Sequence, residues 1–124
     1  MKKYLLLIAL IPVLLYLLFQ VPVNLKANTI IVPDDYPTIQ SAIDASGNGD
    51  TIIVEPGRYV EGINFRGKRI TVASRFYTEQ YTSYISRTII GGNREVFSVV
   101  VFESNESSDS KLIGFTITGG NANG

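Results

Sequence analysis

The chain has 124 residues, the length of a single domain. It contains no cysteine and no histidine, so disulfides, thiolate metal sites, cysteine nucleophiles and histidine-based triads or zinc sites are excluded. Lys plus Arg and Asp plus Glu each number 11, which gives a formal charge of zero. No basic stripe is present, which argues against a nucleic-acid partner, and no residue pattern indicates a cofactor or a metal site.

The N-terminal segment has the pattern of a secretory signal. A positive start, Met1-Lys2-Lys3, precedes an apolar run from Tyr4 to Phe19, and Ala27 is a small residue suited to cleavage. The run is slightly shorter than the roughly 20 apolar residues of a spanning helix, and an uncleaved anchor is the alternative. We therefore predict a signal peptide or membrane anchor over 1–27 and a secreted, periplasmic or cell-surface location, with membrane contact through this leader only. Removing it lowers Lys plus Arg from 11 to 8 against 11 acids, a net charge of −3.

A strand and a helix are predicted next. Thr29 to Val32 is rich in β-branched residues, which favours a strand. Thr38 to Ala45 is predicted to be a short helix, because apolar residues recur at spacings of three and four and Thr38 can cap the first turn. These apolar residues are Ile39, Ala42 and Ile43. The cluster Ser46 to Gly49 is typical of a helix end.

The remaining chain is predicted to form short, frequently interrupted strands. We group them as two coils of three strands: 51–54, 63–65 and 70–72, then 88–90, 99–102 and 112–118. Alternation directs one set of apolar side chains inward. They are Ile52, Val54, Ile63, Phe65, Ile70, Val72, Phe115 and Ile117. Each strand is too short to bury a core alone, so the coils are expected to stack.

Three segments together resemble a known family. They are Val32-Pro33-Asp34-Asp35-Tyr36-Pro37-Thr38-Ile39-Gln40-Ser41-Ala42-Ile43, Gly49 to Tyr59, and Gly114-Phe115-Thr116-Ile117-Thr118-Gly119-Gly120. In this order they resemble the N-terminal part of right-handed parallel β-helix repeat proteins of the pectin lyase-like superfamily. The resemblance spans roughly Thr29 to Gly120. It implies an all-β fold, the start of a right-handed parallel β-helix (solenoid), with a short N-terminal capping α-helix.

The resemblance also sets the expected domain organisation. Residues 28–124 are expected to be the N-terminal coils of a truncated, longer β-helix, because no cap follows the last core strand. The alternative is a last coil that pairs with a partner. Unpaired strand edges associate with other chains, so self-association through the C-terminal edge is also expected.

Candidate functional residues are few. Asp34 and Asp35 are adjacent carboxylates, but their place between a strand and a helix favours a structural turn over a metal site. Some members of the superfamily are polysaccharide lyases, hydrolases or esterases, yet no catalytic residue can be carried over from their motifs. The excursion 74–87 places three tyrosines outside the coils, where rings can stack on sugars or pack on the coil surface. They are Tyr77, Tyr81 and Tyr84, and Arg75 and Arg87 flank them.

Two functions follow as hypotheses. The first is an exported, non-catalytic β-helix protein that presents a surface to carbohydrate or to the cell envelope, with polysaccharide as the partner. The alternative is the N-terminal part of a polysaccharide lyase or hydrolase whose active site lies downstream. Fold resemblance alone does not decide between them.

Overall fold

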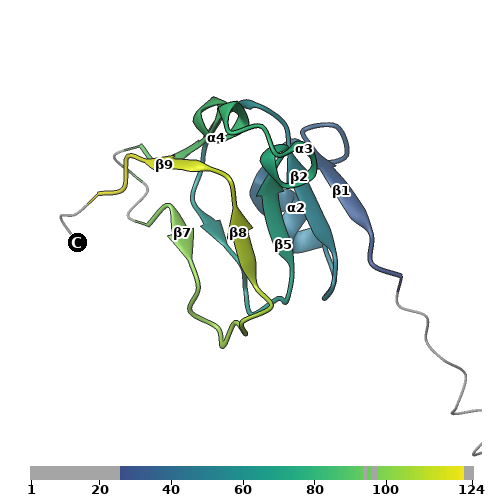
Figure 1. Ribbon diagram of the computed structural model, residues 1–124. Coiled ribbons are helices and arrows are strands. Elements are labelled where there is room, and N and C mark those ends of the chain that lie inside the picture. Colours follow the sequence, from purple (N-terminus) through teal and green to yellow (C-terminus); the bar gives the residue numbers. More distant parts are fainter. Residues whose placement is uncertain (1–25, 94, 96–97, 122–124) are drawn as a thin grey trace, which may run out of the picture.

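The computed structural model describes residues 26–93, 95 and 98–121. Within them, 17% of the residues are helical and 32% lie in strands, in three short helices and three small parallel sheets (Figure 1). The chain is therefore mixed α/β. The prediction of an all-β, right-handed parallel β-helix is wrong, because the excursion after residue 74 adds helices, and the small sheets do not by themselves establish a solenoid.

Most of the predicted leader, residues 1–25, lies outside the described part of the chain. In the part that is described, no helix is both long enough and apolar enough to cross a membrane.

Every strand pair in the three sheets is parallel and in register. Sheet A has the order β1 (Thr29–Val32), β2 (Thr51–Val54), β5 (Thr71–Ser74) and β8 (Lys111–Ile113). Sheet B contains β3 (Gly57–Val60), β6 (Thr88–Gly91) and β9 (Thr116–Thr118), and sheet C contains β4 (Ile63–Asn64) and β7 (Val100–Val101). From β2 onward the chain visits A, B and C in turn, so sequence neighbours always lie in different sheets.

The predicted strands are mostly present but were grouped wrongly. Gly57–Val60 forms β3, a strand that the sequence does not predict because the dipeptide Pro56-Gly57 is typical of a turn. As a result 70–72 was assigned to the first coil, whereas β5 pairs with β2 in the same sheet. The single strand expected over 112–118 is two strands, because Gly114 turns the chain with a φ of 78°.

The core forms where equivalent positions of paired strands stack. Ile52, Val72 and Leu112 occupy one such ladder, and Ile63 and Val100 another. The predicted inward direction is confirmed for the six buried residues Ile52, Val54, Ile63, Phe65, Ile70 and Val72. Phe115 packs against this core, whereas Ile117 remains 45% exposed although it pairs with the buried Ile90.

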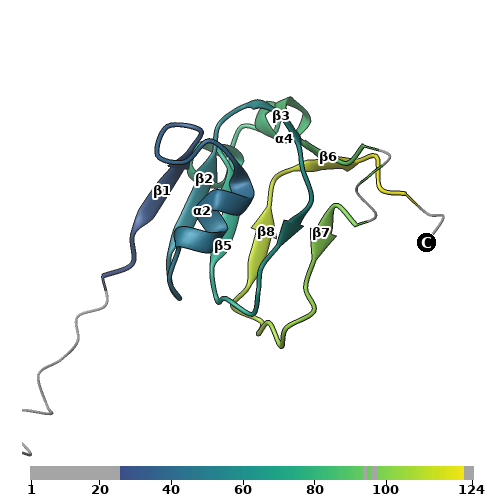
Figure 2. The same cartoon turned by 180° about the vertical axis from the view of Figure 1, so that it is seen from behind.

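The first described helix, α2 (Ile39–Ala45), confirms the predicted helix and its cap. Thr38 Oγ1 accepts a hydrogen bond from Ser41 N at 3.1 Å, and the apolar face, Ile39, Ala42 and Ile43, is fully buried in the core. The helix lies behind sheet A in Figure 1 and in front of it in Figure 2. An amphipathic helix of this kind buries its apolar stripe and leaves its polar side chains to bond neighbouring strands.

Candidate functional site

The most exposed aromatic side chain among the described residues, Tyr81, lies on the excursion between β5 and β6. This segment forms two short helices, α3 (Phe76–Glu79) and α4 (Ser83–Arg87), at one end of sheets A and B (Figure 1). Gln80 ends α3 with a φ of 61°, and its N–H bonds to Phe76 O. Thr116 Oγ1 of β9 donates to Ile85 O at 2.8 Å, which ties α4 to sheet B. The excursion is therefore an ordered part of the fold.

The three predicted tyrosines all lie on this segment, and two of them are largely open to solvent. Tyr77 on α3 is 45% exposed, and Tyr81, between the helices, is 66% exposed. Tyr84 on α4 is half-buried, and its ring centroid lies 6.5 Å from that of Tyr81 at an interplanar angle of 42°. We call these three residues the tyrosine surface. The structure pairs Tyr81 with Tyr84, while Tyr77 stands on the neighbouring helix.

Polar contacts fix Tyr84 in place. Its hydroxyl donates to Glu79 Oε2 at 2.7 Å, and this hydrogen bond raises the pKa of the Tyr84 phenol above its usual value. The Arg87 guanidinium lies 5.6 Å from the Tyr84 ring centroid, a cation–π distance. Sequence reasoning missed Glu79, although it precedes Tyr84 by only five residues. These contacts hold the Tyr84 ring as a support beside the more exposed Tyr81.

Arg75 does not act as a free cation beside the tyrosines. Its guanidinium forms an ion pair with Glu55, at the end of β2, and its Nε donates to Glu55 Oε1 at 2.8 Å. This hydrogen bond raises the pKa of Arg75 above its usual value. Of the two arginines that flank the tyrosines, Arg87 is therefore the exposed one.

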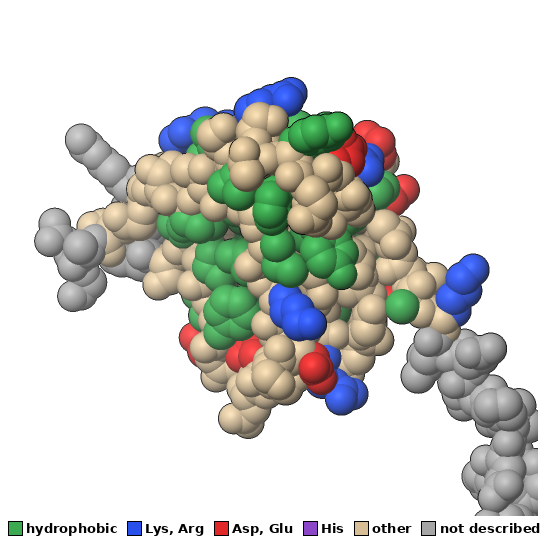
Figure 3. All heavy atoms as spheres, viewed as in Figure 1, with side chains coloured by type: hydrophobic (Ala, Val, Ile, Leu, Met, Phe, Trp, Pro, Cys, Tyr) green, Lys and Arg blue, Asp and Glu red, His purple; other side chains and the backbone are tan. Residues whose placement is uncertain are grey.

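Apolar side chains gather on the face that carries β8, β5 and α3 (Figure 3). Ile53 and Ala73, in register on β2 and β5, are almost fully buried although they alternate with the core residues Ile52 and Val72. This face is therefore partly apolar beneath the excursion. The exposed rings of the excursion suit broad, shallow contacts with a ligand.

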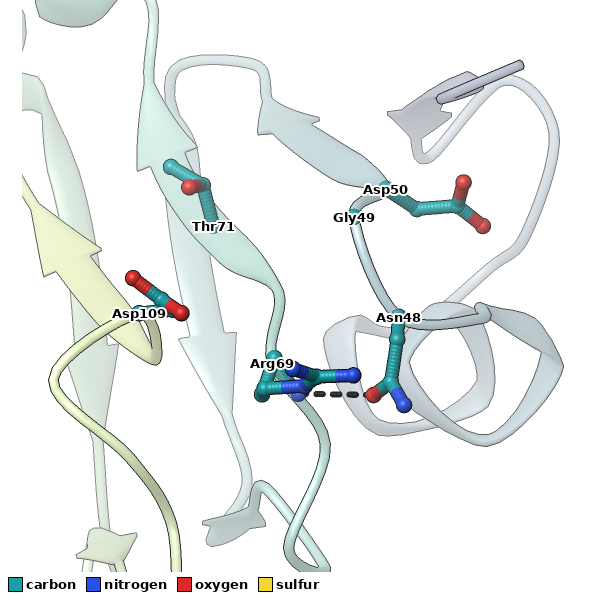
Figure 4. Close-up of a pocket in the computed structure, with 6 residues that line it drawn as sticks. All are labelled: Asn48, Gly49, Asp50, Arg69, Thr71 and Asp109. Atoms are coloured by element: carbon teal, nitrogen blue, oxygen red, sulfur yellow. Dashed lines mark hydrogen bonds between the residues drawn. The ribbon is translucent and has the colours of Figure 1, made fainter. Parts of the chain in front are cut away.

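A separate shallow hollow lies at the opposite end of β5. It has a volume of about 340 Å³ and is lined by Asn48, Gly49, Asp50, Arg69, Thr71 and Asp109 (Figure 4). The Asp50 carboxylate points away from Asp109 and Arg69 in this view. It accepts hydrogen bonds from Asn28 N at 2.9 Å and from Gly47 N at 2.8 Å. The Asp50 carboxylate therefore binds backbone N–H groups of two neighbouring segments.

The structure brings no metal-binding cluster together among the residues it describes. No group of three or more carboxylates in that part of the chain is placed to hold a metal ion. Asp35 has the structural turn role predicted for it, since its Oδ2 accepts a hydrogen bond from Ile31 N at 2.7 Å. No family model matches the chain, and neither curated proteins nor solved structures provide a match.

Proposed function

We propose that the chain is an exported, non-catalytic protein that binds polysaccharide through the tyrosine surface. The exposure of Tyr81 and Tyr77 on an ordered excursion carries this proposal, because exposed aromatic rings offer apolar faces on which a sugar ring can stack. The resemblance of its segments to the pectin lyase-like superfamily, predicted from sequence, supports carbohydrate as the ligand class.

The geometry favours contact along a sugar chain. None of the three tyrosines lines the hollow of Figure 4, and the exposed rings of Tyr77 and Tyr81 offer an open platform. A ring face covers the apolar C–H face of a pyranose, and the rigid ring loses little conformational entropy on binding. Arg87 and Glu79 lie beside Tyr84. There Glu79 can accept hydrogen bonds from sugar hydroxyls, and Arg87 can donate hydrogen bonds to hydroxyls or to an acidic group.

Three variants test the proposal by affinity electrophoresis in gels that contain neutral or uronate polysaccharides. Tyr81→Ala is expected to weaken binding about tenfold or more, equivalent to about 1.4 kcal/mol, because it removes a ring face. Tyr81→Phe keeps the ring and should retain most of the affinity. Val60→Ala removes an apolar side chain that is 56% exposed but lies on β3, so it should have no effect.

Two results would count against the proposal. One is equal binding by the parent chain and Tyr81→Ala, with folding of both verified by circular dichroism. The other is turnover of the polymer, seen as new reducing ends or unsaturated products, which would favour the enzymatic alternative. Since Tyr81 is exposed and makes no core contact, its replacement should leave the fold intact.

A further inference from the structure

Helix α4 lies against the outer face of sheet B. Ile90 of β6 is buried in the core, so alternation directs its neighbour Ile89 and the in-register Arg58 of β3 to the opposite, outer face. Thr116 of β9 also pairs with Ile89, and its hydroxyl donates to Ile85 O of α4 at 2.8 Å. Figure 2 shows α4 beside β3 and β6. The face on which Arg58 projects is therefore the one that α4 covers in part.

Arg58 lies across the neighbouring strand β6. It is exposed, and it is the single charged residue of β3, β6 and β9. A Cβ added at Gly91 of β6 would lie 3.4 Å from Arg58 Nη2, so the guanidinium rests over the strand where a glycine leaves room. A long side chain placed in this way covers sheet surface with its stem and keeps its charged head in water. The N–H donors of Arg58 are therefore open to a ligand.

Arg87 is the second cation on this side of the molecule. It ends α4 directly before β6, is exposed, and has its guanidinium 5.6 Å from the Tyr84 ring centroid. A guanidinium beside a ring face keeps the N–H donors that point away from the ring. The Glu79 carboxylate already accepts the hydrogen bond of the Tyr84 hydroxyl. We call Arg58 and Arg87 together the arginine surface.

The arginine surface has no acidic partner in the described part of the chain. The ion pairs found there join Arg66 to Asp44 and Arg75 to Glu55. Helix α4 and the three strands of sheet B contain no Asp or Glu. Figure 3 shows basic side chains on the part of the surface that lies over α4. This region is therefore positive in a chain whose acidic and basic residues are equal in number.

We propose that the arginine surface extends the tyrosine surface and selects polysaccharides whose sugars carry anionic groups, either carboxylates or sulfate esters. This inference rests on the proposed polysaccharide binding. A sugar chain that stacks on Tyr81 and Tyr84 reaches Arg87 next. Strand β6 starts directly after Arg87 and leads to the Arg58 guanidinium over Gly91. A guanidinium binds an anion with two or more oxygens through parallel N–H bonds, which a neutral sugar cannot match.

Three polymers that share one backbone test this selection: dextran, carboxymethyl dextran and dextran sulfate. Binding of the purified full chain to each immobilised polymer is measured by biolayer interferometry at low and high salt. We expect both charged polymers to bind more tightly than dextran at low salt. The difference should shrink in about 1 M salt, where the Debye length is only about 3 Å. The tighter of the two charged polymers identifies the preferred anion.

Charge-removing variants assign the selection to the arginine surface. Arg58→Gln and Arg87→Gln should each weaken binding of the charged polymers about two- to fivefold, as expected for an exposed ion pair, and leave dextran binding nearly unchanged. Arg69→Gln removes the same charge from the exposed hollow of Figure 4 and should have little effect. Val60→Ala should also leave binding unchanged, because it alters β3 beside Arg58 without a change of charge.

The outcomes separate this inference from the proposed function. Equal binding of dextran and the charged polymers would overturn the inference, as would losses for the two arginine variants no larger than for Arg69→Gln. A loss of binding in Tyr81→Ala would still support the tyrosine surface in either case. Binding that depends on the two arginines but not on Tyr81 would contradict the proposed function and leave the arginine surface as an anion site. Circular dichroism verifies the folding of each variant.

Discussion

Gly114 and Gly49 both have positive φ, but only Gly114 sits in a crowded place. A Cβ at Gly114, whose φ is 78°, would lie 2.6 Å from Ser74 Oγ and 3.0 Å from Phe76 Cβ. A Cβ at Gly49, whose φ is 93°, would meet nothing within 4 Å. Gly114 therefore serves two purposes: it turns the chain from β8 to β9, and it lets that turn pack under α3.

Substitutions at the two glycines separate the cost of backbone strain from the cost of steric overlap. Gly49→Ala should lower the free energy of unfolding by about 1 kcal/mol through backbone strain alone. Gly114→Ala should cost a further 1–3 kcal/mol or so, because the methyl group overlaps Ser74 and Phe76. Urea unfolding followed by circular dichroism measures both. Equal losses for the two variants would show that the turn is less tightly packed than the structure indicates.

Helix α2 is held at both ends by side chains from later strands and turns. Glu61 accepts hydrogen bonds from Ile39 N at 3.2 Å and Gln40 N at 2.8 Å, where an anion suits the helix N-terminus. Lys68 Nζ donates to three carbonyl oxygens at the other end, at 2.6, 2.8 and 2.7 Å. These acceptors belong to Ile43, Asp44 and Ser46.

Loss of the Lys68 ammonium should loosen the helix. Lys68→Met keeps most of the apolar stem but leaves these carbonyls without their donor, so the free energy of unfolding should fall by about 1–3 kcal/mol. Lys111→Met is the control, because Lys111 is exposed and its side chain makes no recorded bond. Unfolding at low protein concentration separates this effect from association. A loss no larger than that of the control would mean that solvent replaces the ammonium without cost.

A carboxylate links two successive turns and should make the fold sensitive to acid. Glu106 accepts hydrogen bonds from Gly67 N at 2.9 Å and Ser104 N at 2.8 Å. The bond from Gly67 is the main cause of a pKa for Glu106 lowered from its ordinary value of 4.5. The ionised form is therefore favoured by folding, so its contribution is complete above pH 4.5 and is lost as the pH falls through the lowered value.

Thermal unfolding across pH 3–6 (about the range of carboxyl titration) tests this linkage. The parent chain should lose stability as the pH falls, and Glu106→Gln should lose less over the same interval because its amide does not titrate. Glu95→Gln controls for removal of one negative charge, since Glu95 is exposed. Parallel pH curves for the parent and Glu106→Gln would contradict the linkage.

Local sequence patterns predicted helix α2 and most strands well, but they predicted the pairing of the strands poorly. Spacing and capping chemistry gave the helix with Thr38 as its cap, and alternation gave the buried direction of Ile52 and Phe65. Strand β3 was missed because Gly57 beside a proline favours a turn, although strand pairing with β6 overrides that preference. Helices α3 and α4 are too short for a periodic signal.

Part of the candidate site was predictable for similar reasons. An aromatic-rich interruption between β-branched segments indicated that Tyr77, Tyr81 and Tyr84 lie outside the sheets. The ion pair of Arg75 with Glu55 joins residues 20 positions apart, and no local pattern indicates such a contact. Exposure also depends on packing: Tyr81 is open to solvent, whereas Tyr84 is half-buried against Arg87 and Glu79.

At the scale of the whole molecule, the tyrosine surface is separate from the stacked core. It lies on α3 and α4, beside one end of the strands, whereas the core forms between the strands of the three sheets and α2. A substitution at an exposed tyrosine should therefore change ligand binding with little effect on the free energy of unfolding.

The measurement that tests the central claim most directly is nuclear magnetic resonance mapping of the tyrosine ring signals. Neutral and uronate oligosaccharides are titrated into the labelled chain, with assignments from Tyr→Phe variants. We expect a saturable shift of the Tyr81 and Tyr77 ring signals with at least one sugar class, and a smaller shift of the Tyr84 ring signals. The amide signals of Asn48 and Arg69, in the hollow of Figure 4, should not shift. Shifts confined to that hollow, or no saturable shift with any sugar, would contradict the account.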